Sequence, residues 1–177
     1  MCVLCFSDLA AANQDLLYTE SVFRYEIIGP KNLVCTGFKS NGVGITANHC
    51  IKGSQEFINV SPDVDISFTP LVPENMKNLS VCITPPLINE RVMLFGYPGW
   101  AINRLRITYG NIISVDGDGI LTDIVAYTGE SGGPLLSIER QCVYGVLKGL
   151  LMRKYTYTAV SVFTPLYHWT EQLKPVH

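Results

Sequence analysis

The sequence predicts an all-β protein, and three observations lead to this fold class. Short runs rich in β-branched and aromatic residues recur along the chain, Gly, Pro and Asn separate them, and no long helical segments lie between them. Strands at this spacing are typical of a sandwich or a barrel. Periodicity alone does not distinguish these two architectures.

The expected strands fall into two groups. In the first half they cover residues 22–28, 33–38, 42–46, 56–60 and 65–69. In the second half they cover residues 91–96, 105–108, 111–115, 120–127, 134–138, 142–151 and 155–163.

The segment between the two groups indicates how the chain is organised. Residues 70–86 contain four prolines and little periodicity, which predicts a linker. We therefore expect residues 1–177 to form a single unit of two β lobes, residues 1–80 and residues 81–177. Helical spacing at residues 165–173, with Pro165 suited to a first helical turn, predicts a short C-terminal helix.

The composition carries no signature of nucleic-acid or membrane binding. The 177 residues are 47% hydrophobic and have a formal net charge of −2, and the chain is long enough to bury a core. Lys and Arg are scattered, so we expect no nucleic-acid partner. No apolar run approaches the roughly 18 residues that span a bilayer, and residues 1–8 lack the features of a signal peptide. The lone Cys2/Cys5 pair does not recur, so no metal or other cofactor is expected.

A glycine-rich run at residues 128–134 (Thr-Gly-Glu-Ser-Gly-Gly-Pro) presents Ser131 as a candidate nucleophile. A serine hydroxyl attacks a carbonyl well only when a base takes its proton and N–H donors face the developing oxyanion. Gly129 permits a tight turn that would point its own N–H and that of Ser131 into one space. Alone, the run also fits the nucleophile elbow of α/β-hydrolases or a glycine-rich β-turn. The chain lacks the long helices that the hydrolase fold needs.

His49 is the second part of the pattern. It follows a short apolar strand in residues 44–50 (Gly-Ile-Thr-Ala-Asn-His-Cys) and precedes Ser131 in the chain. This segment closely resembles the Thr-Ala-Ala-His-Cys motif of chymotrypsin-like serine proteases. The resemblance extends to residues 33–38, 81–85, 95–100 and 157–160. It implies two six-stranded-type antiparallel β-barrels with a short C-terminal helix, and the activity of a serine endopeptidase.

The resemblance implies a role for each matched residue. His49 would be the general base and then the acid, Ser131 the nucleophile, and the N–H groups of Gly129 and Ser131 the oxyanion hole. The third triad member should be a carboxylate that fixes the imidazole tautomer. Asp65 fits the family's order of Asp, apolar, small and apolar residues, whereas Asp63 would place a charge in the strand. Two acidic turn residues beside a proline are the alternative without a catalytic role.

Two departures from the family change what we expect of the enzyme. Asp65 comes only 16 residues after His49, so the first barrel must be abbreviated, as in small viral relatives. Glu130 stands where secreted zymogens have the aspartate that binds a newly formed N-terminus, and no activation site is present. We therefore expect activity without a zymogen cleavage of this kind.

The resemblance also implies the positions that bind substrate: Ala126, Thr128, Leu147, Lys148 and Gly149. Val125 stands where trypsin-like enzymes carry an aspartate, so specificity for Lys or Arg is not expected. Leu147 replaces the histidine with which picornavirus-type main proteases read glutamine, so that specificity is not supported either. Lys148 is either a contact for an acidic substrate residue or a solvated side chain.

The cysteines leave two pairings open. Cys35 and Cys50 match two cysteines that form a disulfide in the family, and a reducing compartment would leave both as thiols. The family counterpart of Cys82 bonds an N-terminal peptide, which makes Cys2 or Cys5 its conceivable partner. Cys142 has no evident partner.

Three interpretations of the function follow. The short length, abbreviated first barrel and missing activation site resemble the proteases of positive-strand RNA viruses, which would act on the viral polyprotein in the host-cell cytoplasm. A bacterial HtrA-like or glutamyl-endopeptidase-like protease is the second interpretation, and a catalytically inactive binding module is the third. The first two imply a polypeptide substrate, and the sequence does not define the oligomeric state.

Overall fold

The computed structural model describes residues 18–27, 33–51, 54, 56–101, 103–117, 119–152 and 159–172. The fold class of this part of the chain is all-β, as predicted, with a short 3-10 helix among the strands. The N-terminal elements are β1 Val22–Ile27, β2 Leu33–Ser40, β3 Val43–Thr46, the short 3-10 helix η1 Asn48–Cys50, β4 Ile58–Asn59 and β5 Ser67–Thr69. The C-terminal strands are β6 Arg91–Gly96, β7 Arg106–Asp116, β8 Gly119–Thr122, β9 Pro134–Ser137, β10 Val143–Met152 and β11 Ala159–Pro165.

The N-terminal strands form one antiparallel sheet in the order β1-β2-β3-β5-β4. The turn between β2 and β3 is Asn41-Gly42, with φ angles of 49° and 81°. Positive φ at both positions is what a type I′ hairpin turn requires, and Asn-Gly is its preferred sequence. β3 then pairs with β5, so that Thr46 lies opposite Ser67. This pairing brings the residues that follow β3 next to those that precede β5.

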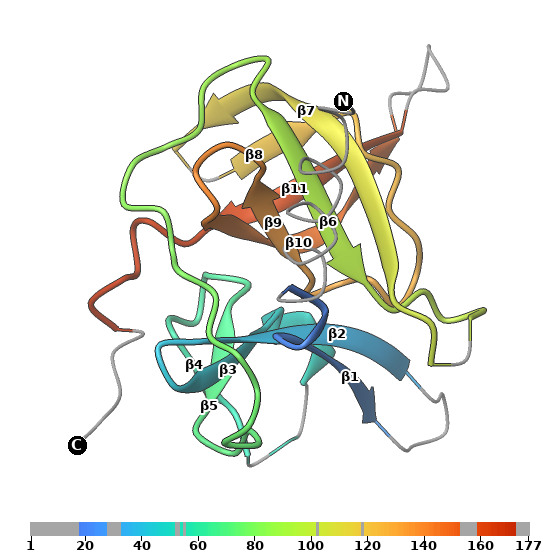
Figure 1. Ribbon diagram of the computed structural model, residues 1–177, viewed down its shortest axis with the longest axis vertical. Coiled ribbons are helices and arrows are strands. Elements are labelled where there is room, and N and C mark those ends of the chain that lie inside the picture. Colours follow the sequence, from blue (N-terminus) through green and yellow to red (C-terminus); the bar gives the residue numbers. More distant parts are fainter. Residues whose placement is uncertain are drawn as a thin grey trace, which may run out of the picture.

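The C-terminal strands form a closed barrel in the order β10-β11-β8-β7-β6-β9, which occupies the upper half of Figure 1 above the N-terminal sheet. β9 begins just after the Ser131 turn and pairs with both β6 and β10. Two strands were expected at residues 105–108 and 111–115. β7 is instead continuous, because Gly110 and Asn111 keep the pairing register with β6.

One buried apolar cluster spans both lobes. Phe38 and Ile45 of the N-terminal sheet belong to the same cluster as Phe95 and Val146 of the barrel, and all four are 0% exposed. A second cluster fills the barrel itself. Since burial of apolar surface is the dominant favourable term in folding, the packing that stabilises each lobe also holds the two lobes together.

The chymotrypsin-like architecture expected from the sequence is present in a truncated form. The C-terminal lobe is a closed six-stranded barrel, whereas the described N-terminal strands form a five-stranded sheet rather than a second closed barrel. No helix among the described residues is long and apolar enough to cross a bilayer.

The predicted C-terminal helix is wrong for the described part of residues 165–173. Pro165 ends β11, and the Leu166 N–H donates a hydrogen bond to the Tyr144 carbonyl at 2.8 Å. Two successive i→i−3 turns follow, from Trp169 to Leu166 and from Gln172 to Trp169. Leu166 is fully buried in the cluster shared by the lobes. This tertiary contact overrides the helical spacing of the sequence.

Two disulfides pair four of the cysteines. Cys35 on β2 is bonded to Cys50 in η1, the pairing that the family resemblance implied. Cys82 is bonded to Cys142 and not to Cys2 or Cys5, the two partners that the resemblance suggested. The backbone explains this second bond, because the Cys82 N–H donates to the Val143 carbonyl at 2.9 Å, directly beside Cys142.

Candidate active site

His49 lies in η1, immediately after β3. The four residues of β3 are buried between β2 and β5, and Ala47 continues the chain in an extended conformation. On the other side of His49, Cys50 is bonded to Cys35. The backbone of His49 is therefore anchored on both sides, while its side chain stays 42% exposed.

Asp65 binds His49 at two points. The ring Nδ1 of His49 lies 2.8 Å from Asp65 Oδ2, and the backbone N–H of His49 donates to Asp65 Oδ1, also at 2.8 Å. A carboxylate only accepts, so the ring must carry its proton on Nδ1. Nε2 is then left as the proton acceptor. Asp63, by contrast, is exposed and forms no hydrogen bond or ion pair with another described residue.

The surroundings keep Asp65 ionised. Burial raises the pKa of this carboxyl, but two hydrogen bonds from His49 and the positive charges of His49 and Lys148 together lower the pKa more. The net pKa lies below the usual value of 3.8. Asp65 is therefore a carboxylate at neutral pH and stabilises a positive charge on the imidazole.

Ser131 lies in the turn that leads into β9. Its carbonyl accepts a hydrogen bond from the Thr36 N–H at 2.8 Å. The same oxygen is 3.7 Å from Sγ of Cys50, the residue next to His49. No hydrogen bond joins the Ser131 hydroxyl to the His49 ring in this structure. Such bonds often tighten only when substrate binds.

The peptide between Thr128 and Gly129 is held in one orientation. The Thr128 carbonyl accepts a hydrogen bond from the Gly99 N–H at 2.7 Å. Because the peptide bond is trans, the Gly129 N–H points the opposite way. Neither this N–H nor that of Ser131 donates to any described residue. Two N–H donors without a described acceptor therefore flank Glu130, and such donors are what an oxyanion hole needs.

Glycine is required at two positions of this turn. Gly129 has a φ of +101°, and a Cβ there would lie 2.5 Å from the Gly99 nitrogen. Gly132 has a φ of +86°, and a Cβ there would lie 2.1 Å from the Thr36 carbonyl oxygen. Side chains at either position would be strained and would push the turn away from its neighbours.

Thr36 joins the two lobes at the turn. Its hydroxyl donates to the Gly129 carbonyl and accepts from the Tyr97 N–H, both at 2.9 Å. Thr36 belongs to β2, whereas Tyr97 and Gly129 belong to the C-terminal lobe. The candidate oxyanion hole is thus fixed partly from the N-terminal lobe.

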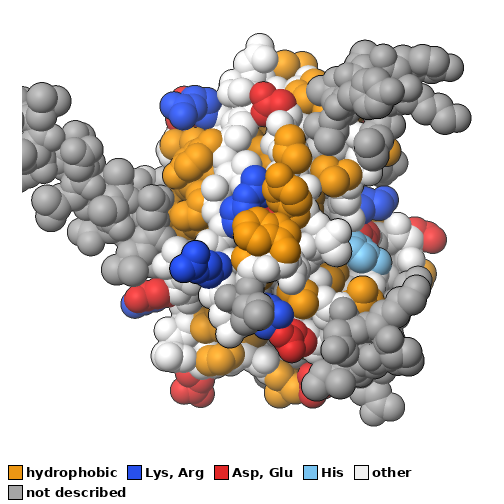
Figure 2. Space-filling view, turned by 90° about the vertical axis from the view of Figure 1, so that its right-hand side faces the viewer, with side chains coloured by type: hydrophobic (Ala, Val, Ile, Leu, Met, Phe, Trp, Pro, Cys, Tyr) orange, Lys and Arg blue, Asp and Glu red, His pale blue; other side chains and the backbone are white. Residues whose placement is uncertain are grey.

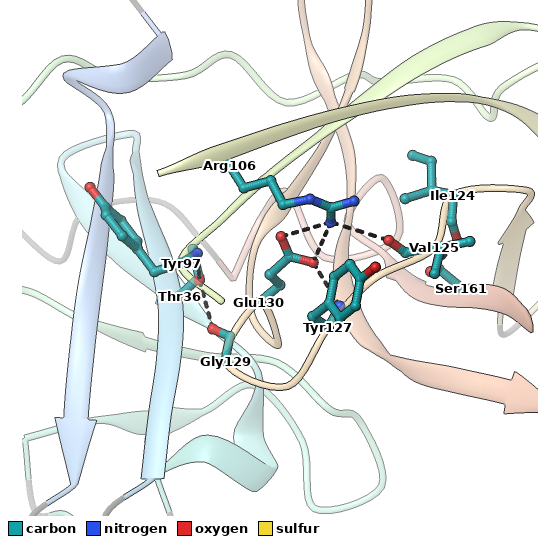
Figure 3. A network of polar contacts seen from close by, with 9 residues as sticks. All are labelled: Thr36, Tyr97, Arg106, Ile124, Val125, Tyr127, Gly129, Glu130 and Ser161. Carbon is teal, nitrogen blue, oxygen red and sulfur yellow. Dashed lines mark hydrogen bonds and ion pairs between the residues drawn. The ribbon is translucent and has the colours of Figure 1, made fainter. Parts of the chain in front are cut away.

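Glu130 is fully buried and points into the C-terminal lobe (Figure 3). Both of its carboxylate oxygens lie 3.1 Å from Nη1 of Arg106, and one also accepts the Tyr127 N–H at 2.7 Å. Arg106 donates further to the Val125 carbonyl at 3.2 Å. Glu130 thus pairs with a cation of its own chain, whereas the family's aspartate at this position binds a newly formed N-terminus.

Comparison with known proteins supports the fold. No family model and no curated protein matches the sequence. Among solved structures, the active form of the Rv3671c protease from M. tuberculosis matches with a TM-score of 0.74 and 20% identity, over 96% of this chain and 87% of that one. The HtrA-type protease AlgW with a tripeptide matches with a TM-score of 0.75 and 16% identity, over 90% of this chain and 61% of that one. A serine endoprotease from Yersinia pestis has a TM-score of 0.70 and 17% identity, over 89% of this chain and 64% of that one.

The chain has the chymotrypsin-like fold. At these identities the likeness concerns the fold alone. In this fold His49, Asp65 and Ser131 come from three separate segments: η1, the residues before β5 and the turn before β9.

The residues expected to bind substrate lie in different surroundings. Ala126 and Leu147 are buried in the cluster inside the chymotrypsin-like barrel, with exposures of 3% and 1%. Thr128 is exposed beside the candidate oxyanion hole, and a Cβ at Gly149 would meet no atom within 4 Å. Lys148 is exposed and lines one pocket together with Asp65, whose pKa its charge lowers.

An apolar pocket adjoins the candidate oxyanion hole. We call it the Trp100 pocket; its lining residues are Leu33, Val34, Gly99, Trp100, Tyr127 and Thr128. Trp100 is 71% exposed and meets Tyr127 edge to face. Figure 2 shows hydrophobic side chains gathered around a basic side chain on the right-hand face of the molecule. The pocket is built by both lobes of the chymotrypsin-like fold.

Sequence reasoning missed Thr36, Arg106 and the Trp100 pocket. Thr36 carried a weak signal, because it stands where the family has a glycine after its first cysteine. Glu130 carried another, since a buried carboxylate requires a cation, but the sequence does not say which of the 13 Lys and Arg residues supplies it. The described residues contain no group of three His, Cys, Asp or Glu side chains that could hold a metal ion.

Proposed function

We propose that this protein is a serine endopeptidase that hydrolyses peptide bonds through an acyl-enzyme on Ser131. The observation that carries the proposal is the two-point binding of His49 by Asp65. It leaves Nε2 of an exposed imidazole as a base. The Ser131 turn has two N–H groups that donate to no described residue. The turn also carries Ser131, whose carbonyl contacts the residue next to His49.

Each group has a part in the proposed reaction. His49 Nε2 takes the Ser131 hydroxyl proton as Oγ attacks the scissile carbonyl, and the Gly129 and Ser131 N–H groups bind the resulting oxyanion. The imidazolium, stabilised by Asp65, then protonates the leaving amine and the acyl-enzyme forms. Water, deprotonated by His49, attacks the acyl carbonyl. The imidazolium then returns that proton to Ser131 Oγ as the bond between Oγ and the acyl carbon breaks.

The substrate is proposed to be a polypeptide, and two natural roles compete. Processing of a viral polyprotein in the host-cell cytoplasm is supported by the small N-terminal lobe. An HtrA-like role is supported by the structural likeness to the HtrA-type protease AlgW. A peptide-library cleavage profile separates them, because a polyprotein protease should cut a few defined junctions and an HtrA-like enzyme many unfolded segments.

A fluorophosphonate probe tests the activity itself. The wild-type protein should be labelled on Ser131, and S131A should not be labelled while keeping the wild-type circular dichroism and Tm. Absence of labelling on folded wild-type protein would support the third interpretation, an inactive binding module.

A further inference from the structure

We infer that Arg106 is a positioning residue, the internal cation that holds residues 125–131 in the conformation that presents the two oxyanion donors. We call this segment the oxyanion loop. The inference rests on the proposed function and goes beyond it, because it explains how the loop is ordered without a cleavage that frees a new N-terminus.

The first step is the burial of Glu130. Its side chain has no exposed surface, and a buried carboxylate is strongly disfavoured unless it is paired and hydrogen-bonded. Arg106 supplies the pairing, and the Tyr127 N–H supplies a further hydrogen bond. Gly96 makes the room, since a Cβ there would lie 2.7 Å from Cβ and Cγ of Glu130.

The second step is that Arg106 is fixed by the barrel. It is the first residue of β7 and pairs with Gly96 on β6, so its backbone is part of the closed sheet. Its side chain is 27% exposed and is covered by the Tyr127 ring, whose centroid lies 4.6 Å from the guanidinium carbon. The cation is therefore anchored on a rigid element and shielded on one face.

The third step is that one side chain holds three points of the oxyanion loop. Arg106 contacts the Val125 carbonyl, the Tyr127 ring and the Glu130 carboxylate (Figure 3). The free N–H groups belong to the residues on either side of Glu130. If the Glu130 carboxylate left its site for solvent, the two peptide units next to it would have to turn, and the donors would turn with them.

The test compares two arginine pairs of the same barrel. R106M removes the cation at nearly constant length. R140M is the matched control, because Arg140 pairs with buried Glu90 at 3.7 Å and lies 5.7 Å from the Tyr144 ring centroid, away from the oxyanion loop. We expect R106M to lower kcat on a peptide substrate about 10²–10³-fold, with KM little changed, as for loss of an oxyanion donor. R140M should change kcat less than about twofold.

R106K provides the conservative variant if R106M folds poorly. Lysine keeps the charge but loses the planar guanidinium that lies over the Tyr127 ring, so kcat should fall between the wild-type and R106M values. A folded R106M with wild-type kcat, or an equal loss of kcat in R106M and R140M, would overturn the inference.

Hydrogen exchange separates this inference from the proposed function. Peptides covering residues 125–133 should exchange faster in R106M than in wild type, and at the wild-type rate in R140M. This readout needs no activity. A wild-type protein that fluorophosphonate does not label would refute the proposed function alone, whereas unchanged exchange in R106M would refute the role of Arg106.

Discussion

The carboxylate of Asp65 occupies both of its oxygens with His49, one with the ring and one with the backbone. A single hydrogen bond would orient the ring only about one axis. The second fixes where the carboxylate itself sits relative to η1. Position and tautomer of the imidazole are therefore set by one residue.

Replacing Asp65 tests this arrangement directly. D65N keeps the shape but provides an amide that can donate to Nδ1, which stabilises the wrong tautomer. We expect kcat to fall by about 10⁴-fold. D63N, two residues away on an exposed side chain, should keep wild-type kcat. Measuring kcat of the two variants side by side decides the assignment, and equal activity of both would remove Asp65 from the triad.

Acid should weaken the fold through the same residue. Burial raises the pKa of Asp65, and the hydrogen bonds and charges of His49 and Lys148 lower the pKa further than burial raises it. Because the pKa is depressed in the folded state, ionised Asp65 stabilises the fold above its unfolded pKa of about 4. This stabilisation is lost as pH falls through the lower folded pKa.

Urea unfolding of wild type and D65N between about pH 7 and pH 2.5 measures the effect. The difference in free energy of unfolding should shrink as the pH falls below about 4. A difference that does not change with pH would mean that the depressed pKa does not contribute to stability.

At the scale of elements, the two disulfides hold different parts of the fold. Cys35–Cys50 closes 15 residues and fixes η1, whereas Cys82–Cys142 closes 60 residues and ties the segment between the lobes to the barrel. If a disulfide acts through the entropy of the unfolded chain, the longer loop gives more stability, about 4 against about 3 kcal/mol.

Removing one disulfide should therefore mainly reduce stability, and removing the other should mainly reduce activity. C82S/C142S should lose more free energy of unfolding, and C35S/C50S should lose more kcat because His49 adjoins Cys50. The free energy of unfolding, from denaturant titration, and kcat are measured on both proteins to test this prediction. A parallel loss of both quantities in one variant would contradict it.

At the scale of the whole molecule, the Trp100 pocket is formed where the lobes meet. Under the proposed function, a large apolar substrate side chain near the scissile bond would fill it. We expect a peptide-library profile to show a preference for a large apolar residue at one substrate position. W100A should lower kcat/KM for substrates with that residue by about 10-fold. Y109A, another exposed aromatic outside the pocket, should leave the profile unchanged.

Features that depend on residues close together in the chain could be predicted from the sequence, whereas features that depend on distant residues could not. The all-β class depends on local pattern, and it was predicted from the sequence. The pairing of Arg106 with Glu130 and of Cys82 with Cys142 depends on the register of distant strands, which no local pattern encodes. The C-terminal helix was wrong for the related reason that Leu166 is held by the shared core.

The Cys82–Cys142 bond has a consequence for how the molecule would respond to being cut. Just after Cys82 the chain runs through an exposed apolar stretch, with Ile83, Leu87 and Ile88 at 84%, 66% and 63% exposure. A nick between residues 83 and 88 would divide the chain into two polypeptides, yet the disulfide would keep them covalently joined. In denaturing electrophoresis the nicked protein would migrate as one species until a reductant released two fragments. The Cys82–Cys142 bond would thus allow a disulfide-linked two-chain form of the molecule.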